Sequence, residues 1–90
     1  MAAIFNLNIT TPERTVYDGN VSSLIAPGEL GYLGILANHR PIVAKLGPGK
    51  IIVRDENGKS IVFYSDGYGF IEVLKNTARI LLDSIRTSPN

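Results

Sequence analysis

The sequence contains no cysteine and no tryptophan, and it has one histidine and one methionine. Without cysteine, neither a disulfide nor a thiolate ligand for zinc is available. A single histidine excludes a histidine-rich metal site, because a structural or catalytic metal needs three or four ligands. Packing, alone or together with a partner, must therefore hold this chain of 90 residues, of which 44% are hydrophobic.

Long apolar runs and an excess of one charge are also missing. No window reaches the roughly 18 apolar residues that a membrane span requires, and residues 1–4 lack the features of a signal peptide. The formal net charge is +1, which is too small for a mainly electrostatic nucleic-acid binder. We expect one soluble domain on the cytoplasmic side, which reaches a membrane only through a partner.

Alternation of apolar and polar residues is the main pattern that the chain does show. Phe5, Leu7 and Ile9 fall on one face of an extended segment, which is typical of a half-buried strand. Asn57-Gly58 predicts a hairpin, because both residues tolerate positive φ. Further strands are expected at residues 16–17, 21–26, 51–54, 61–65, 70–74 and 78–82.

The spacing of the turns between these segments indicates the fold class. Turn-forming residues recur roughly every 8–12 positions, as in sandwiches and barrels. No segment keeps a helical period for three turns, so we expect an all-β fold. Residues 29–41, with two glycines and a proline, are interpreted as a loop. Residues 51–53 and 61–64 are apolar on both faces, and a partner is the favoured cover for the outer face.

Reactive groups do not gather in any recognisable motif. His39 lies in a turn setting before Pro41, and it lacks the nucleophile elbow that would support a triad. Asp55 and Glu56 flank a hairpin tip, where solvated turn residues are usual. The glycines around Tyr68 lack the Gly-Lys-Ser/Thr ending of a phosphate loop. We therefore expect no catalytic residue, no metal and no cofactor, and a protein that is not itself an enzyme.

Five segments, in order along the chain, resemble motifs of the ε subunit of F-type ATP synthase. Each motif is weak alone, but together they cover nearly the whole chain. They read TPERTVYDG at residues 11–19, VSSLIAPG at 21–28, GYLGILANHRP at 31–41, LGPG at 46–49 and GFIEV at 69–73.

This resemblance implies both a fold and a role. The fold is a flattened β-sandwich of about ten strands in two sheets, spanning residues 1–84, with residues 85–90 as a tail or linker. The role is that of a non-catalytic rotor subunit in the central stalk, which couples rotation to ATP synthesis. It implies a peripheral location on the cytoplasmic face of the bacterial inner membrane, or the equivalent face of another energy-transducing membrane.

The resemblance also implies two contact surfaces. One end of the sandwich rests on the polar loops of the proton-translocating c-ring, and one face packs on the γ subunit. Ile52, Val62 and Tyr64 are the expected contacts with γ, although a register error of one residue would exchange the two faces. The expected c-ring contacts, all at the same end, are Glu29, Leu30, Gly31, Tyr32 and His39.

Some features depart from the family's usual pattern. The family usually carries a C-terminal helical hairpin that can inhibit ATP hydrolysis, and this inhibitory arm is expected to be missing from this chain, which stops at Asn90. Residues 82–87 are faintly similar to an ATP-binding motif of some members, which we interpret as a coincidence because the position is too early. The rival hypothesis is a free-standing β-sandwich that binds a sugar or a peptide, which would need exposed aromatic residues on a concave face.

Overall fold

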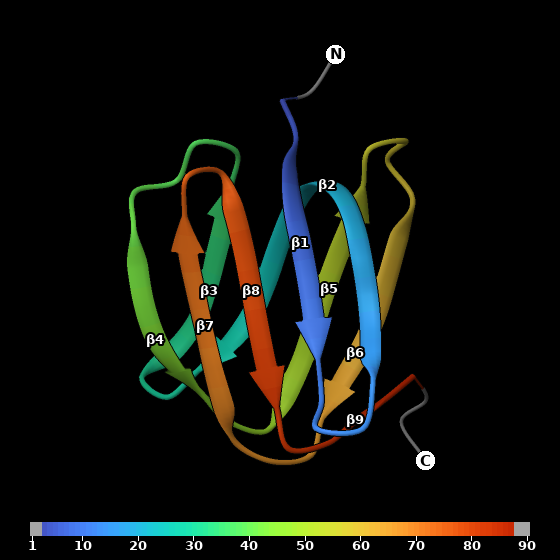
Figure 1. Ribbon diagram of the computed structural model, residues 1–90, viewed down its shortest axis with the longest axis vertical. Coiled ribbons are helices and arrows are strands. Elements are labelled where there is room, and N and C mark those ends of the chain that lie inside the picture. The colour runs from blue at the N-terminus through green and yellow to red at the C-terminus, as the bar shows by residue number, and fades with distance from the viewer. Residues whose placement is uncertain (1–2, 88–90) are drawn as a thin grey trace.

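A computed structural model describes residues 3–87, and every regular element in this range is a β-strand (Figure 1). The predicted all-β class is confirmed, with nine strands where about ten were expected. The strands are β1 (Phe5–Thr10), β2 (Thr15–Gly28), β3 (Gly31–Leu36), β4 (Ile42–Leu46), β5 (Gly49–Asp55), β6 (Ser60–Ser65), β7 (Gly69–Leu74), β8 (Thr77–Leu82) and β9 (Ile85–Arg86).

The strands form two layers that share β2. In the first layer, β4, β7, β8, β1 and the start of β2 lie side by side in that order. In the second, β3, the end of β2, β5, β6 and β9 follow one another. β1 and β8 are parallel, and the other pairs are antiparallel. Figure 1 shows β1, β7 and β8 in front of β3 and β5.

β2 corrects the prediction of two separate strands at residues 16–17 and 21–26. It runs without a break through Gly19 and changes layer on the way. Its register with β5 shifts between Val21 and Ser23, which marks a β-bulge. A bulge inserts one extra residue and so resets the alternation. Leu24 is therefore buried, and Ile25, which unbroken alternation from Val21 would bury, is 40% exposed.

The core lies between the two layers and consists of alternate residues from the strands. Burying one such side chain stabilises the fold by roughly 1.5–3 kcal/mol. No buried side-chain nitrogen or oxygen within residues 3–87 lacks a hydrogen-bond partner. The core residues are Phe5, Leu7, Ile9, Val21, Leu24, Ala26, Ile35, Leu46, Ile51, Val53, Phe63, Ile71, Val73, Ala78, Ile80 and Leu82.

The interpretation of residues 29–41 as a loop is wrong for much of their length. Gly31–Leu36 is strand β3, and Ile42–Leu46, for which no strand was expected, is β4. Glycine permits the turn into β3, because the φ of Gly31 is 138°. β3 then pairs along the end of β2 and buries Ile35. β3 is decided by its hairpin with β2 across the turn at Glu29-Leu30, and β4 by pairing with the distant strand β7.

The expected boundary between the sandwich and a tail at residue 84 also differs. Ile85–Arg86 forms β9 and pairs with the end of β6. Nε of Arg86 donates to both carboxylate oxygens of Asp66 at 2.8 Å. Residues 85–86 therefore belong to the second sheet. The last three residues of the expected tail, 88–90, lie outside the described range.

Candidate functional site

No cluster of reactive side chains is present in the described part of the chain. Within residues 3–87, no group of three or more His, Asp or Glu residues is placed to hold a metal ion. Burial, followed by the charges of Asp55 and Glu56, raises the pKa of Tyr17. The Tyr17 ring packs edge-on against the ring of Phe63. In this range no helix is long and apolar enough to cross a membrane. Candidate functional residues must therefore be sought on the outer surfaces.

The turn between β2 and β3 brings together four of the five expected c-ring residues at the lower end of the molecule (Figure 1). The side chain of Leu30 is 100% exposed at this turn. The Glu29 N–H donates to the carbonyl of Lys45 at 3.0 Å. The Lys50 N–H donates to the hydroxyl of Tyr32 at 3.2 Å. We call Glu29, Leu30, Gly31 and Tyr32 the tip, which β4 and β5 brace from either side.

His39 does not lie at the tip, which corrects the expectation of a shared end. The whole of β3 separates it from Gly31, and a strand of six residues spans roughly 20 Å. The β3–β4 loop that contains His39 lies at the upper end in Figure 1, beside the β7–β8 turn. There the Asn38 N–H donates to Oδ1 of Asn76 at 2.8 Å. The ring Nδ1 of His39 lies 2.7 Å from the carbonyl oxygen of Arg40.

The three expected γ-contact residues do share one face. Ile52 and Val62 are direct partners across β5 and β6, and both are half-buried on the outside of the second sheet. Tyr64 follows two residues later on β6, with the Arg86 guanidinium 5.5 Å from its ring centroid. Ile25 of β2 pairs with Ile52 and extends the row. We call Ile25, Ile52, Val62 and Tyr64 the β5–β6 outer face.

A second apolar surface lies on the outside of the first sheet, and sequence reasoning missed it. Phe70 pairs with Leu81 across β7 and β8, and their exposed fractions are 52% and 51%. Val43 of β4 is 72% exposed and Leu74 is 42% exposed. Residues 70–74 carry apolar side chains on both faces of the strand, and this was the available signal in the sequence. The surface was missed because β4, which contributes Val43, was not recognised as a strand. We call Val43, Phe70, Leu74 and Leu81 the β7–β8 outer face.

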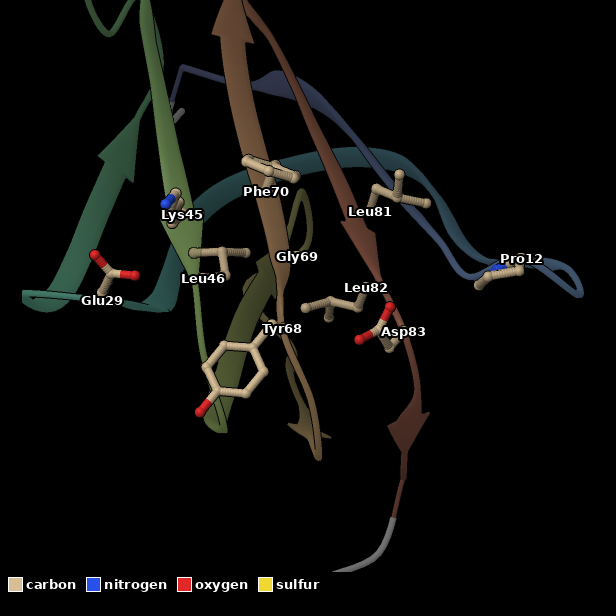
Figure 2. A pocket seen from close by; sticks show the side chains of 10 residues that line it. All are labelled: Pro12, Glu29, Lys45, Leu46, Tyr68, Gly69, Phe70, Leu81, Leu82 and Asp83. Carbon is tan, nitrogen blue, oxygen red and sulfur yellow. The ribbon is translucent and has the colours of Figure 1, made fainter.

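A hollow of about 430 Å³ opens where the tip meets the β7–β8 outer face (Figure 2). We call it the lower pocket. Figure 2 shows the side chains of Leu46 and Leu82 pointing toward each other between Glu29 on one side and Asp83 on the other. Its lining residues are Pro12, Glu29, Lys45, Leu46, Tyr68, Gly69, Phe70, Leu81, Leu82 and Asp83.

Comparison with known families gives one match over most of the chain. The model for the β-sandwich domain of the ATP synthase delta/epsilon chain matches residues 4–88. The chain is 45% identical over 78 residues to the ATP synthase epsilon chain of Leptospira borgpetersenii, covering 87% of this chain and 60% of that protein. Identity to the epsilon chain of Dichelobacter nodosus is 41% over 83 residues, covering 92% and 57%. The chain thus spans about three fifths of these relatives.

Solved structures share the same fold. A chain of the Euglena gracilis mitochondrial ATP synthase matches with a TM-score of 0.85 and 24% identity, covering 94% of this chain and 54% of that chain. A chain of the Tetrahymena thermophila mitochondrial ATP synthase central stalk and c-ring matches with a TM-score of 0.75 and 21% identity, covering 93% and 66%. At these identities the likeness concerns the fold alone.

Proposed function

The chain belongs to the family of ATP synthase delta/epsilon chain β-sandwich domains, and from this membership we propose that it is a non-catalytic central-stalk subunit of an F-type ATP synthase. In this role it binds the γ subunit and the c-ring and couples ring rotation to ATP synthesis. The single observation that carries the proposal is the family match over residues 4–88. The subunit is peripheral on the cytoplasmic face of the bacterial inner membrane, or on the equivalent face of another energy-transducing membrane.

The c-ring contact in this proposal is the tip. Full exposure of Leu30 supports it, since a large apolar side chain held in water gains free energy when a partner buries it. Tyr32 adds a rigid aromatic surface, which is common at the centre of interfaces. Glu29 pairs with a basic ring loop and gives register more than affinity. His39 is left out, because it lies at the other end of β3.

The γ contact in this proposal is an apolar outer sheet face, and two faces qualify. The β5–β6 outer face holds Ile52, Val62 and Tyr64, the residues expected from the sequence. The β7–β8 outer face exposes more of its side chains, with Val43 at 72% and Phe70 at 52%. Exposed contiguous apolar surface marks interaction sites. Greater exposure therefore favours the β7–β8 outer face, and the expected contact through Ile52 and Val62 is the second candidate.

Site-specific crosslinking tests the role and separates the two faces. Because the chain has no cysteine, one introduced cysteine is a unique attachment point for a photoactivated crosslinker. Leu30→Cys probes the tip, Val62→Cys and Phe70→Cys probe the two faces, and Glu56→Cys on the distant hairpin is the control. Each tagged variant is assembled into source membranes, irradiated, solubilised and analysed by mass spectrometry.

We expect position 30 to link to the c subunit, one of positions 62 and 70 to link to γ, and position 56 to link to neither. Recovery of neither γ nor c from a well-folded chain would overturn the stalk role. In that case the free-standing binding module would be the better reading. Links from position 62 alone to γ would restore the face expected from the sequence.

A further inference from the structure

We propose that the lower pocket is a binding site for an apolar side chain that a docking protein presents beside a lysine or arginine. The pocket shares Glu29 with the tip, and Phe70 and Leu81 with the β7–β8 outer face, but the stalk role names no occupant for the hollow between them. The proposal stands on the geometry and charge of the pocket itself. It therefore goes beyond the proposed function. The occupant is a ligand of defined chemistry, an apolar group joined to a cation.

The size and lining of the pocket suit an apolar anchor. Its volume of about 430 Å³ lies within the range of roughly 300–1,000 Å³ that ligand pockets occupy. Leu46 and Leu82 are buried at its base. Tyr68, Phe70 and Leu81 are 66%, 52% and 51% exposed, so that a ligand has apolar surface to cover. Pockets of this kind receive the few side chains that dominate binding energy at interfaces.

The charges around the pocket select the sign of the ligand. Glu29 and Asp83 stand on opposite sides in Figure 2, and neither makes a salt bridge within residues 3–87. Lys45 is the one cation among the lining residues, so the two carboxylates leave a net charge of −1. Tyr68 adds an aromatic ring, whose face attracts cations. A cationic group therefore binds more favourably here than a neutral or anionic group of the same shape.

Both carboxylate residues are held in place by the backbone of other lining residues. The Glu29 N–H donates to the Lys45 carbonyl at 3.0 Å, and the Asp83 N–H donates to the Tyr68 carbonyl at 3.2 Å. These bonds join the tip to β4 and the end of β8 to the loop before β7. The bonds fix the backbone of both residues on either side of the apolar floor, and both residues are exposed, so that their carboxylates are accessible to a ligand.

Three small probes of matched shape test the proposal on the full chain. They are phenethylammonium, the neutral 2-phenylethanol and the anionic 3-phenylpropionate. Binding is followed by amide chemical shifts of the ¹⁵N-labelled protein. We expect shifts at the residues that line the pocket, with the cation bound most tightly and the anion least. Raising the salt concentration narrows the difference in affinity between the cationic and the anionic probe, because exposed charges are screened.

Matched variants separate the charge from the apolar floor. The double variant Glu29→Gln, Asp83→Asn removes both carboxylates, and we expect the cation to lose about three- to tenfold in affinity while the neutral probe changes little. Lys45→Gln strengthens cation binding. Leu81→Ser weakens all three probes together. Glu56→Gln, which removes one negative charge at the other end of the sandwich, leaves every affinity unchanged.

Two results would overturn the proposal. One is the absence of shifts at the lining residues with every probe, and the other is equal affinity for cation, neutral and anion. Circular dichroism of each variant shows whether it is folded. Because these measurements involve no other subunit, their failure leaves the crosslinking result for the stalk role intact, and failure of the stalk role leaves the pocket chemistry intact.

Discussion

The backbone N–H of Asn38 donates to the side-chain oxygen of Asn76 at 2.8 Å, and this bond joins the β3–β4 loop to the β7–β8 turn. The same side chain donates through Nδ2 to the Ile4 carbonyl at 3.0 Å. One asparagine thus ties three segments together at the upper end. It also occupies a left-handed conformation, with a φ of 59°, beside Lys75 with a φ of 50°.

Replacing Asn76 should separate the effect of its hydrogen bonds from the effect of its backbone conformation. Asn76→Gly keeps the positive φ at no steric cost and loses two bonds, so we expect a loss of about 1–2 kcal/mol in the free energy of unfolding. Asn76→Ala should increase this loss by about 1 kcal/mol, because alanine is strained in the left-handed conformation. Urea unfolding measures both.

The neighbouring turn position provides the control for this pair. The Lys75 side chain makes no hydrogen bond with any residue from 3 to 87. Lys75→Gly should therefore keep or slightly raise stability, since glycine tolerates a φ of 50°. Equal losses for Lys75→Gly and Asn76→Gly would contradict the assigned role of the Asn76 amide.

Gly69 is required by its contact with the facing strand. A Cβ at this position would overlap the carbonyl oxygen of Leu81, and backbone atoms of a paired strand cannot move aside. We expect Gly69→Ala to cost about 1–3 kcal/mol, the usual range for overpacking. At Gly34 a Cβ would meet no atom within 4 Å, so Gly34→Ala should be neutral or stabilising. Thermal unfolding of the two variants compares them, and a neutral Gly69→Ala would contradict the contact.

Tyr17 should make stability depend on pH in the alkaline range. Burial, then Asp55 and Glu56, raises its pKa above the ordinary value of 10.0. Above about pH 10 the unfolded chain loses this proton before the folded chain does, so the free energy of unfolding falls as pH rises. Tyr17→Phe keeps the ring against Phe63 and should reduce this fall. Urea unfolding across this pH range measures the effect. If the free energy of unfolding of Tyr17→Phe falls with pH as steeply as that of the unchanged protein, Tyr17 is not the group responsible.

The hydroxyl of Tyr32 should contribute to stability without contributing to c-ring binding. Tyr32→Phe loses the 3.2 Å bond from the Lys50 N–H, which should cost about 0.5–1.5 kcal/mol. The ring that is proposed to contact the partner stays. Tyr32→Ala removes the ring as well and should lower crosslinking from position 30 to the c subunit. If Tyr32→Phe lowers that crosslinking as much as Tyr32→Ala, the ring is not the contact.

Local features of the sequence were enough to predict much of the fold. The hairpin at Asn57-Gly58 was expected and is present. Alternation identified β1, β5, β6, β7 and β8 within one or two residues. These predictions succeeded because strand alternation and turn chemistry depend on residues that are neighbours in the chain.

Local patterns failed where strand pairing and register decide the structure. The bulge near Ser22 reset the inward face of β2, so that Ile25 points outward. The family resemblance predicted Glu29 and His39 at one end, but the pairing of β3 with β2 sets them at opposite ends. No sequence signal marked the lower pocket, which the register of β4, β7 and β8 assembles.

The sequence by itself determined the all-β class, the absence of cysteine chemistry and the strands with two apolar faces. Composition and alternation are properties of the chain alone, and they persist in any arrangement of the strands. Only the tertiary structure decided which of those faces is buried, and that Glu29 and Asp83 stand across one apolar floor. Those outcomes depend on burying all the apolar faces at once, and the energy of that packing belongs to no single segment.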